Sequence, residues 1–533
     1  MVTKSRPRKH FISSNPAPLG GLNVRDAINA MPPTDALDLL NWIPQQYGIK
    51  TRKGWRRFAI GLDAPVRSVM QYQPNREASA ATRIFAATDS GIFNVTSGPD
   101  TPSSVVTLPG TVNYGSFSDT MFTNVAGSFL ITCSHEGGYR TYDGTNWVTR
   151  VAGAGTGEIN GVDPDLFCFT MAWKRRLWFV EKDSTKVWYL PTDSIAGVAE
   201  MLDLGPFMAH GGKIAFIANW TIDAGEGIDD FLIIAGENGD VLIYKGTNPA
   251  SAATFALVGV YQVGALPIGR RGFTAYGGDL LLLSERGIQP MSYVTRGGQS
   301  FLRASSIDYL GKIQPRIAEL IGNSLLQRGW SMIQNPRENL IIISTPSGVT
   351  GIFDQYALYT NTNSWTLLRG MPNNGSMCVA NSQMYFGTEE GEVILAFEGV
   401  YDNVAHGATS GDGITGLIQP AYSYFNMPGM NKKYLMVRPT FLAQAPPAFV
   451  VQIAVDFSNP TPLVPGATTA PPGPAWDISL WDNTDWDGGL DTFDEWKGVG
   501  AIGYAGSVIM RTVTAGDTFL ASLDYMYEPG GVL

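Results

Sequence analysis

The stretch FLIIAGENGDVLIYKG, residues 231–246, decides the fold of this chain. Two apolar runs flank a short polar turn, and Asn238-Gly239 is a favoured pair for a two-residue β-hairpin turn. The same unit returns along the middle of the chain at intervals of 44 to 60 residues. Its copies begin at Ile84, Phe129, Leu177, Phe231, Leu280, Leu340 and Met384.

Each interval holds one hairpin and room for two more strands, which is the content of a four-stranded blade in a β-propeller. Stacking blades in a ring buries the apolar faces that single blades leave exposed. We therefore predict an all-β chain whose residues 61–410 form a β-propeller of about six or seven blades. The alternative is a series of meanders in ordinary β-sandwiches.

The longest interval contains a helical pattern, SSIDYLGKIQPRIAELIGN, at residues 305–323. Ser305 or Ser306 can cap the helix, and Pro315 is expected to kink or divide it. The insertion is either a contact element for another protein or a segment that packs across the propeller's own face. Its apolar face would consist of Leu310, Ile313, Ile317, Leu320 and Ile321.

The repeat ends near residue 410, and a second domain is expected at residues 411–533. FVVQIAVDF, residues 449–457, alternates like a half-buried strand, and the last stretch again has a β pattern. Between them, residues 458–476 contain six prolines and are expected to form a long loop. We predict a β-sandwich-like domain with this proline-rich loop.

The composition limits the possible functions. The 533 residues include 44% hydrophobic residues, enough for packed cores, and the net charge of −10 gives no overall basic surface for nucleic acid. Basic residues gather only in an N-terminal arm around residues 4–9 and at residues 50–57. No signal peptide or long apolar run is recognised, so we expect synthesis in the cytoplasm and no membrane insertion.

No catalytic, cofactor or metal site is predicted. The four histidines lack metal-ligand spacing, and the glycine-rich residues 153–161 lack the lysine of a phosphate loop. The acidic stretch 481–496 offers two interpretations: a calcium site, or packed loops whose acids face solvent. Its candidate calcium ligands are Asp482, Asp485, Asp487, Asp491 and Asp494.

The opening segment is unlike the rest of the chain. Thr34 or Asp35 can cap a short helix after Pro32-Pro33, with apolar anchors in residues 39–43. We predict that residues 1–60 form an arm and docking segment, in which residues 20–60 bridge the propeller to its own C-terminal domain or to a neighbouring subunit. The alternative is a strand that closes the propeller.

This segment, GGLNVRDAINAMPPTDALDLLNWIPQQYGIKTRKGWRRFA at residues 20–59, resembles the N-terminal signature of tail nozzle proteins of short-tailed bacteriophages. These are also called tail hub or packaged-DNA stabilisation proteins. The helical segment SSIDYLGKIQPRI, residues 421–441 and the ending YEPGGVL resemble further motifs of that family. The matching parts of the opening are Gly21-Leu22-Asn23, Arg25-Asp26, Met31-Pro32, Asp35-Ala36, Asn41-Trp42-Ile43-Pro44 and Arg52-x-Gly54.

The resemblance implies a structural virion protein in the tail, assembled in the host cytoplasm as a homo-hexamer. Such a ring lies below the adaptor, or head-to-tail connector, and continues and closes the DNA channel under the portal. It anchors tail fibres or spikes, while double-stranded DNA passes without sequence recognition. The residues expected to dock subunits or the adaptor are Arg25, Asp26, Asp35, Trp42, Leu310, Ile313 and Ile317.

The alternative function is that of a propeller-type glycan-binding or glycan-degrading protein. The 13 Trp and 21 Tyr could stack on sugars, although their strand positions suit core packing equally well. A pair of catalytic carboxylates in a propeller would not be visible in sequence spacing.

Overall fold

The computed structural model describes residues 10–74, 82–223, 228–296, 308–349, 352–458 and 490–532, with residues 460 and 463. Strands hold 53% of the chain and helices 5%, so the all-β prediction is confirmed. The basic arm, the helix cap at residues 305–306, nearly all of the proline-rich loop and residues 481–489 lie outside the described residues. No described helix is long and apolar enough to cross a membrane.

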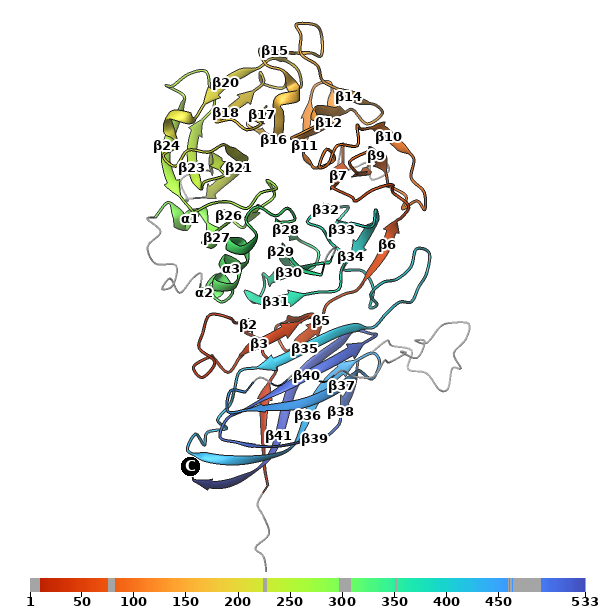
Figure 1. The fold of residues 1–533 in the computed structure, drawn as a ribbon, viewed down its shortest axis with the longest axis vertical. Helices are drawn as coiled ribbons and strands as arrows, with labels where there is room; N and C mark the ends of the chain where they lie inside the picture. The colour runs from red at the N-terminus through yellow and green to blue at the C-terminus, as the bar shows by residue number, and fades with distance from the viewer. Residues whose placement is uncertain are drawn as a thin grey trace, which may run out of the picture.

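The ring of sheets in Figure 1 is a β-propeller of six four-stranded blades and one three-stranded sheet, within the predicted range. The first blade consists of β7 (Ser68–Tyr72), β8 (Arg83–Ala87), β9 (Gly91–Asn94) and β10 (Ser104–Thr107). The second consists of β11 (Phe117–Asn124), β12 (Gly127–Ser134), β13 (Gly138–Tyr142) and β14 (Trp147–Thr149). The third consists of β16 (Phe167–Trp173), β17 (Arg176–Glu181), β18 (Lys186–Tyr189) and β20 (Glu200–Asp203).

The remaining sheets complete the ring. They are β21 (Ile214–Asp223), β22 (Ile228–Gly236), β23 (Asp240–Gly246) and β24 (Phe255–Gln262); the three-stranded β25 (Phe273–Tyr276), β26 (Asp279–Ser284) and β27 (Gly287–Pro290); β28 (Ser331–Asn335), β29 (Leu340–Val349), β30 (Ile352–Tyr359) and β31 (Ser364–Leu368); and β32 (Met377–Ala380), β33 (Gln383–Gly387), β34 (Val393–Ala396) and β6 (Trp55–Ala59).

Every predicted hairpin supplies the second and third strands of its sheet, as the spacing required. The turn in the fourth blade differs from the expectation. The Gly239 N–H donates to the Gly236 carbonyl, and Gly239 has φ of +90° while Asn238 is not left-handed, so the loop has three residues. A Cβ on Gly239 would lie 2.2 Å from the Gly264 carbonyl oxygen, which explains the glycine at this position.

The ring closes through a strand from the other end of the propeller sequence. Strand β6 pairs antiparallel with β34, so residues 55–59 supply the outer strand of the last blade. The apolar core lies mainly between neighbouring blades: Phe85 of the first blade contacts Trp147 of the second, with ring centroids 5.1 Å apart. The predicted strand-closing role is therefore performed by this part of residues 20–60.

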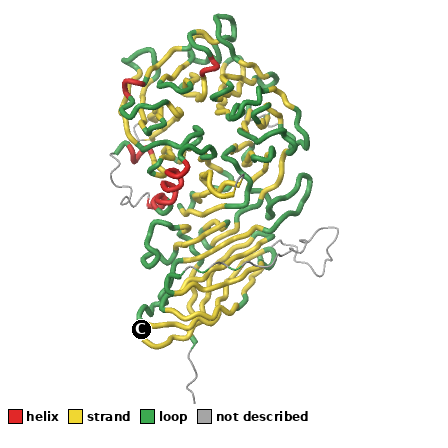
Figure 2. Tube along the Cα trace, viewed as in Figure 1, coloured by secondary structure: helices red, strands yellow, loops and turns green. Residues whose placement is uncertain are grey.

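A β-sandwich lies beside the ring (Figure 2). One sheet contains β35 (Ile414–Pro420), β40 (Gly506–Thr514) and β37 (Ala448–Val455). The other contains β1 (Phe11–Pro16), β4 (Trp42–Pro44), β5 (Ile49–Thr51), β36 (Met430–Ala443), β38 (Asp491–Asp494), β39 (Lys497–Gly503) and β41 (Thr518–Val532). The predicted strands in the C-terminal part are thus present.

The predicted helix after Pro33 is wrong. Its residues form a strand, β3 (Asp35–Leu40), which with β2 (Gly21–Leu22) lies between β31 of the propeller and β35 of the sandwich. Nine strands from both parts therefore form one sheet, in the order β28-β29-β30-β31-β2-β3-β35-β40-β37. Pairing with distant strands outweighs the local capping signal here.

The helical insertion forms α2 (Asp308–Gly311) and α3 (Gln314–Ser324), divided next to Pro315 as predicted. α3 packs against β27 and β29 of its own propeller, which favours the packing interpretation. The other short elements are α1 (Met291–Val294), the 3₁₀ helices η2 (Pro164–Leu166) and η3 (Gly205–Phe207), β15 (Ile159–Asn160) and β19 (Gly197–Val198).

Candidate functional site

The joint between propeller and sandwich is built around Arg52, whose side chain is buried. Both terminal nitrogens of Arg52 donate to the Asp402 carboxylate at 2.7 Å, and Nε donates to Asn41 Oδ1 at 3.0 Å. The remaining two N–H groups reach the backbone oxygens of Lys53 and Arg369. All five donors of the guanidinium are used, which is the condition under which a buried ion pair holds a structure in one geometry.

Asn41 connects three parts of the chain at this joint. Its backbone is left-handed, with φ of 60°, a conformation that asparagine tolerates better than most residues. Its Nδ2 donates to the carbonyls of Arg369, after β31, and Thr415, in β35, while Oδ1 accepts from the Arg369 N–H. One side chain thus ties the N-terminal segment to both the propeller and the sandwich.

Gly54 and Trp42 complete the close packing at the joint. A Cβ on Gly54 would lie 1.7 Å from the Tyr401 carbonyl oxygen, so no larger residue fits without movement. Trp42 is fully buried in a core that the helical insertion and the sandwich share. The motif Asn41-Trp42 and Arg52-x-Gly54, noted in the sequence, therefore has a physical role in this joint.

The structure brings together two predicted docking segments that are almost 300 residues apart. Asp35 is buried, and its carboxylate accepts from Lys312 Nζ at 2.9 Å and from Asn23 Nδ2 at 2.7 Å. The Val24 N–H donates to the Lys312 carbonyl. The N-terminal segment thus docks onto the helical insertion of its own chain.

Arg25 and Asp26 lie at the edge of this contact. Arg25 Nε donates to Asp26 Oδ1 at 2.8 Å, and this hydrogen bond, with Asn23, lowers the pKa of Asp26. Their side chains remain partly exposed, and Ile28, two residues after Asp26, is 46% exposed. These residues leave an accessible edge on the docked segment.

The placement corrects part of the docking hypothesis. Five of the predicted docking residues are buried within this chain. Asp35 lies beside a single apolar core, and the other four belong to that core: Trp42, Leu310, Ile313 and Ile317. Their amphipathic pattern is satisfied within the protomer, so none of them offers a free surface to a neighbouring subunit. Only Arg25 and Asp26 of the predicted set reach the surface. No local pattern marks Lys312 or Asp402 as partners, because each pairs across hundreds of residues.

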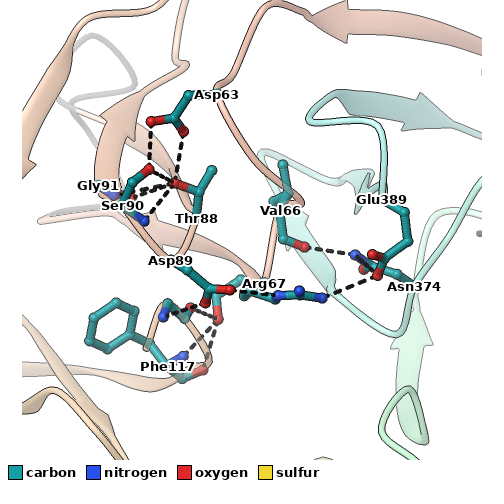
Figure 3. Close-up of polar contacts among 12 residues, drawn as sticks. Asp63, Val66, Arg67, Thr88, Asp89, Ser90, Gly91, Phe117, Asn374 and Glu389 are labelled. Carbon is teal, nitrogen blue, oxygen red and sulfur yellow. Dashed lines mark hydrogen bonds and ion pairs between the residues drawn. The ribbon is translucent and has the colours of Figure 1, made fainter. Parts of the chain in front are cut away.

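The second site is one mouth of the propeller axis, where the innermost strands begin. Arg67, immediately before β7, lies between two carboxylates, with Nε 3.3 Å from Asp89 and Nη1 3.2 Å from Glu389 (Figure 3). The turn carrying Asp89 is held by Asp63, which accepts from the hydroxyls of Thr88 and Ser90. Arg67 thereby links the first blade to the last.

Arg271 reaches across the axis from the segment before β25. Its guanidinium donates to Ser68 Oγ at 2.7 Å and to the carbonyls of Arg67 and Phe117 at 3.1 and 3.0 Å. It also donates to the Gly375 carbonyl at 3.3 Å. One side chain therefore connects the first, second and last blades and narrows the propeller axis at this level.

Below Arg271 the axis opens into a cavity of about 210 Å³, lined by Asp119, Phe169, Phe273, Met332 and Met377, among others. The Asp119 side chain is exposed to this lumen although it lies deep in the ring. Desolvation by the surrounding blades raises the pKa of Asp119 to about 6, and the positive charge of Arg271 opposes this shift.

A larger cavity of about 630 Å³ lies where the propeller meets the sandwich. Its apolar walls include Tyr359 of the propeller and Leu442 and Phe519 of the sandwich, and Tyr47, at its rim, is 86% exposed.

The described residues contain no group of three His, Cys, Asp or Glu side chains placed to hold a metal ion. Asp491 and Asp494 of the predicted calcium set lie on β38, and Asp494 pairs with Arg438.

Comparison with known proteins gives structural likeness only. No protein family and no curated protein matches the sequence. BBS1N, crystallised in complex with ARL6DN and soaked with mercury, is 12% identical, with a TM-score of 0.38, and covers 65% of this chain and 96% of its own. YCF48 from Cyanidioschyzon merolae is 9% identical, with a TM-score of 0.26, over 64% of this chain and 98% of its own.

Proposed function

We propose that this chain is a structural virion protein, the tail nozzle subunit of a short-tailed bacteriophage. The observation that carries the proposal is the joint: the sequence motifs that resemble the nozzle signature are the residues that fix the propeller to the sandwich. Asn41, directly after β3 of the sheet that runs through both parts, acts there together with Arg52 and Gly54. A protomer with fixed internal geometry is what a ring under the pressure of packaged DNA requires.

The axis of a single propeller is a poor path for DNA. Arg271 crosses it, and the cavity below has a volume of only about 210 Å³. In the proposed homo-hexamer, double-stranded DNA therefore passes between the subunits, around the common axis of the ring. The net charge of −10 is compatible with a channel wall that does not hold phosphates tightly.

The surface proposed for contact with a neighbouring subunit or the adaptor is the exposed edge formed by residues 24–30. It carries Arg25 and Asp26, and Val24 and Ile28 are 40% and 46% exposed. Tail fibres or spikes are the further partners of the proposed nozzle. The protein acts by assembly in this proposal, without a catalytic role.

The test is the copy number of the chain in purified virus particles, measured by quantitative mass spectrometry against the portal protein. About half the portal's count is expected of a hexameric nozzle. Absence from particles would overturn the proposal. Screening the purified chain against host polysaccharides, for binding and for release of reducing ends, separates the glycan-directed alternative, which requires a positive result there.

A further inference from the structure

Four arginines gather at the mouth of the propeller axis, and among them Arg67 alone forms an ion pair with a described carboxylate. Arg67, Arg270, Arg271 and Arg328 come from the segments that precede three different innermost strands, β7, β25 and β28. They line two adjoining cavities of about 50 and 20 Å³, which share Ser116, Arg271 and Arg328. Arg67 lines only the larger cavity and Arg270 only the smaller one, whereas Arg271 and Arg328 line both.

The carboxylates at the rim are already engaged. Asp89 and Glu389 flank Arg67, Asp183 accepts from Lys213 Nζ at 2.7 Å, and Glu136 pairs with His135 at 2.8 Å. Arg271 donates to three carbonyls and a hydroxyl, which fix its orientation without neutralising its charge. Asp119 lines the cavity below together with Arg270 and Arg271, but it forms no ion pair with either of them. Three guanidinium groups therefore share this carboxylate, and positive charge remains in excess at the mouth.

Arg270 and Arg328 carry that excess. The buried Nε of Arg270 has no hydrogen-bond partner, and no described residue forms an ion pair with either side chain. Arg270 is held in a left-handed backbone conformation, with φ of 61°. Arg328 is open to solvent at the mouth, and desolvation by the surrounding blades, then the charges of Arg270 and Arg67, lower its pKa. A buried donor without an acceptor is unfavourable, and a bound anion would supply the missing acceptor.

We propose that this mouth binds a compact oxyanion of the phosphate class between Arg270 and Arg328. A guanidinium presents paired N–H donors that match the spacing of phosphate oxygens. Ser116 lines both cavities and Asn113 lines the larger one, and these residue types carry a hydroxyl and an amide donor. The small volume selects inorganic phosphate or the exposed terminal phosphate of a larger molecule. The site is independent of the proposed function, since it lies within one propeller.

The test uses the full chain and inorganic phosphate as the probe, with binding measured by calorimetry and melting temperature at constant ionic strength. We expect phosphate to raise the melting temperature of the natural protein, whereas chloride does not. Arg328→Gln should weaken phosphate binding at least about tenfold. A nucleoside monophosphate and a short DNA duplex, tested in parallel, distinguish free phosphate from a phosphate carried by a nucleotide or by DNA.

The folding of the variant provides a second readout. Because Arg328→Gln removes repulsion from Arg270, its melting temperature without phosphate should equal or exceed that of the natural protein. Arg270→Gln should likewise lose the response to phosphate. Arg175→Gln is the control, since Arg175 is largely exposed and paired with Asp193 in another turn. An equal response of all these proteins to phosphate would overturn the proposal.

Discussion

The joint and the axial mouth both gather arginines, but they treat them in opposite ways. At the joint, Arg52 uses all five donors and faces a carboxylate that receives two of them. At the mouth, Arg270 leaves a buried Nε without a partner. A guanidinium with every donor used is fixed in one geometry, whereas a guanidinium with an unpaired donor keeps the capacity for a further acceptor. The difference separates the residues that hold the protomer together from those that face a ligand.

The largest loss of folding stability is expected from Arg52→Ala. It leaves Asp402 without its partner at the joint, and breaking a buried ion pair costs about 3–5 kcal/mol. Unfolding in urea, followed by fluorescence, should show this loss. Arg175→Ala is the matched control, because it breaks a two-bond arginine–aspartate pair at an exposed position and should leave stability nearly unchanged. Equal effects of the two substitutions would contradict the role assigned to the joint.

Gly54→Ala is expected to cause the next largest loss of folding stability. The added Cβ would overlap the Tyr401 carbonyl oxygen, and overpacking of this kind costs about 1–3 kcal/mol or more. Gly322→Ala, within α3, is the control because a Cβ there meets no atom within 4 Å. Removing a helical glycine should stabilise the chain by about 0.5–1 kcal/mol. The two melting temperatures should therefore move in opposite directions.

Asp35→Asn tests the contact between the N-terminal segment and the helical insertion. It weakens the partner of Lys312, and we expect a loss of about 1–3 kcal/mol. Hydrogen exchange should rise in residues 20–36 and 308–324 together, since each segment holds the other. Glu319→Gln is the control: it breaks an exposed pair with Arg316 on α3 and should cost about 0.2–0.5 kcal/mol.

The smallest expected effect is a pH dependence of stability that comes from Asp119 in the lumen. Its pKa is raised from 3.8 to about 6, so the folded state binds the proton more tightly than the unfolded state. Stability should therefore fall as pH rises from about 4 through 6, and Asp119→Asn should remove this part of the pH dependence. Melting temperatures of both proteins, measured from pH 4 to 7.5, should agree at low pH and diverge above it. A constant difference between the two melting temperatures across this pH range would contradict the raised pKa of Asp119.

The repeated hairpins were predictable because their signals are local. Apolar runs flanking a turn every 44 to 60 residues specify strand pairs that lie next to each other in sequence, and the helix that Pro315 divides was visible in the same way. The loop at Asn238-Gly239 shows the limit of even this information, since the hairpin was correct and its turn type was not.

The joint was less predictable because its contacts join distant residues. Residues 35–40 pair with β35, which lies more than 370 residues later, and no local pattern distinguishes that strand from a capped helix. Arg52 stood within a basic cluster, and nothing in the sequence marked Asp402 as its partner. Arg270, Arg271 and Arg328 meet only because the ring brings the ends of separate blades together.

The pairing of β1 with β41 has a consequence for the order of folding. Phe11 lies opposite Tyr527, so the ribosome must make more than 500 further residues before β1 can find its partner. At about 5–20 residues per second, the ribosome needs on the order of half a minute to two minutes to make those residues. The outer strand β6 is also ready long before β34. Both the ring and the sandwich therefore close late, and a chain interrupted before its last strand would carry open sheet edges that invite aggregation.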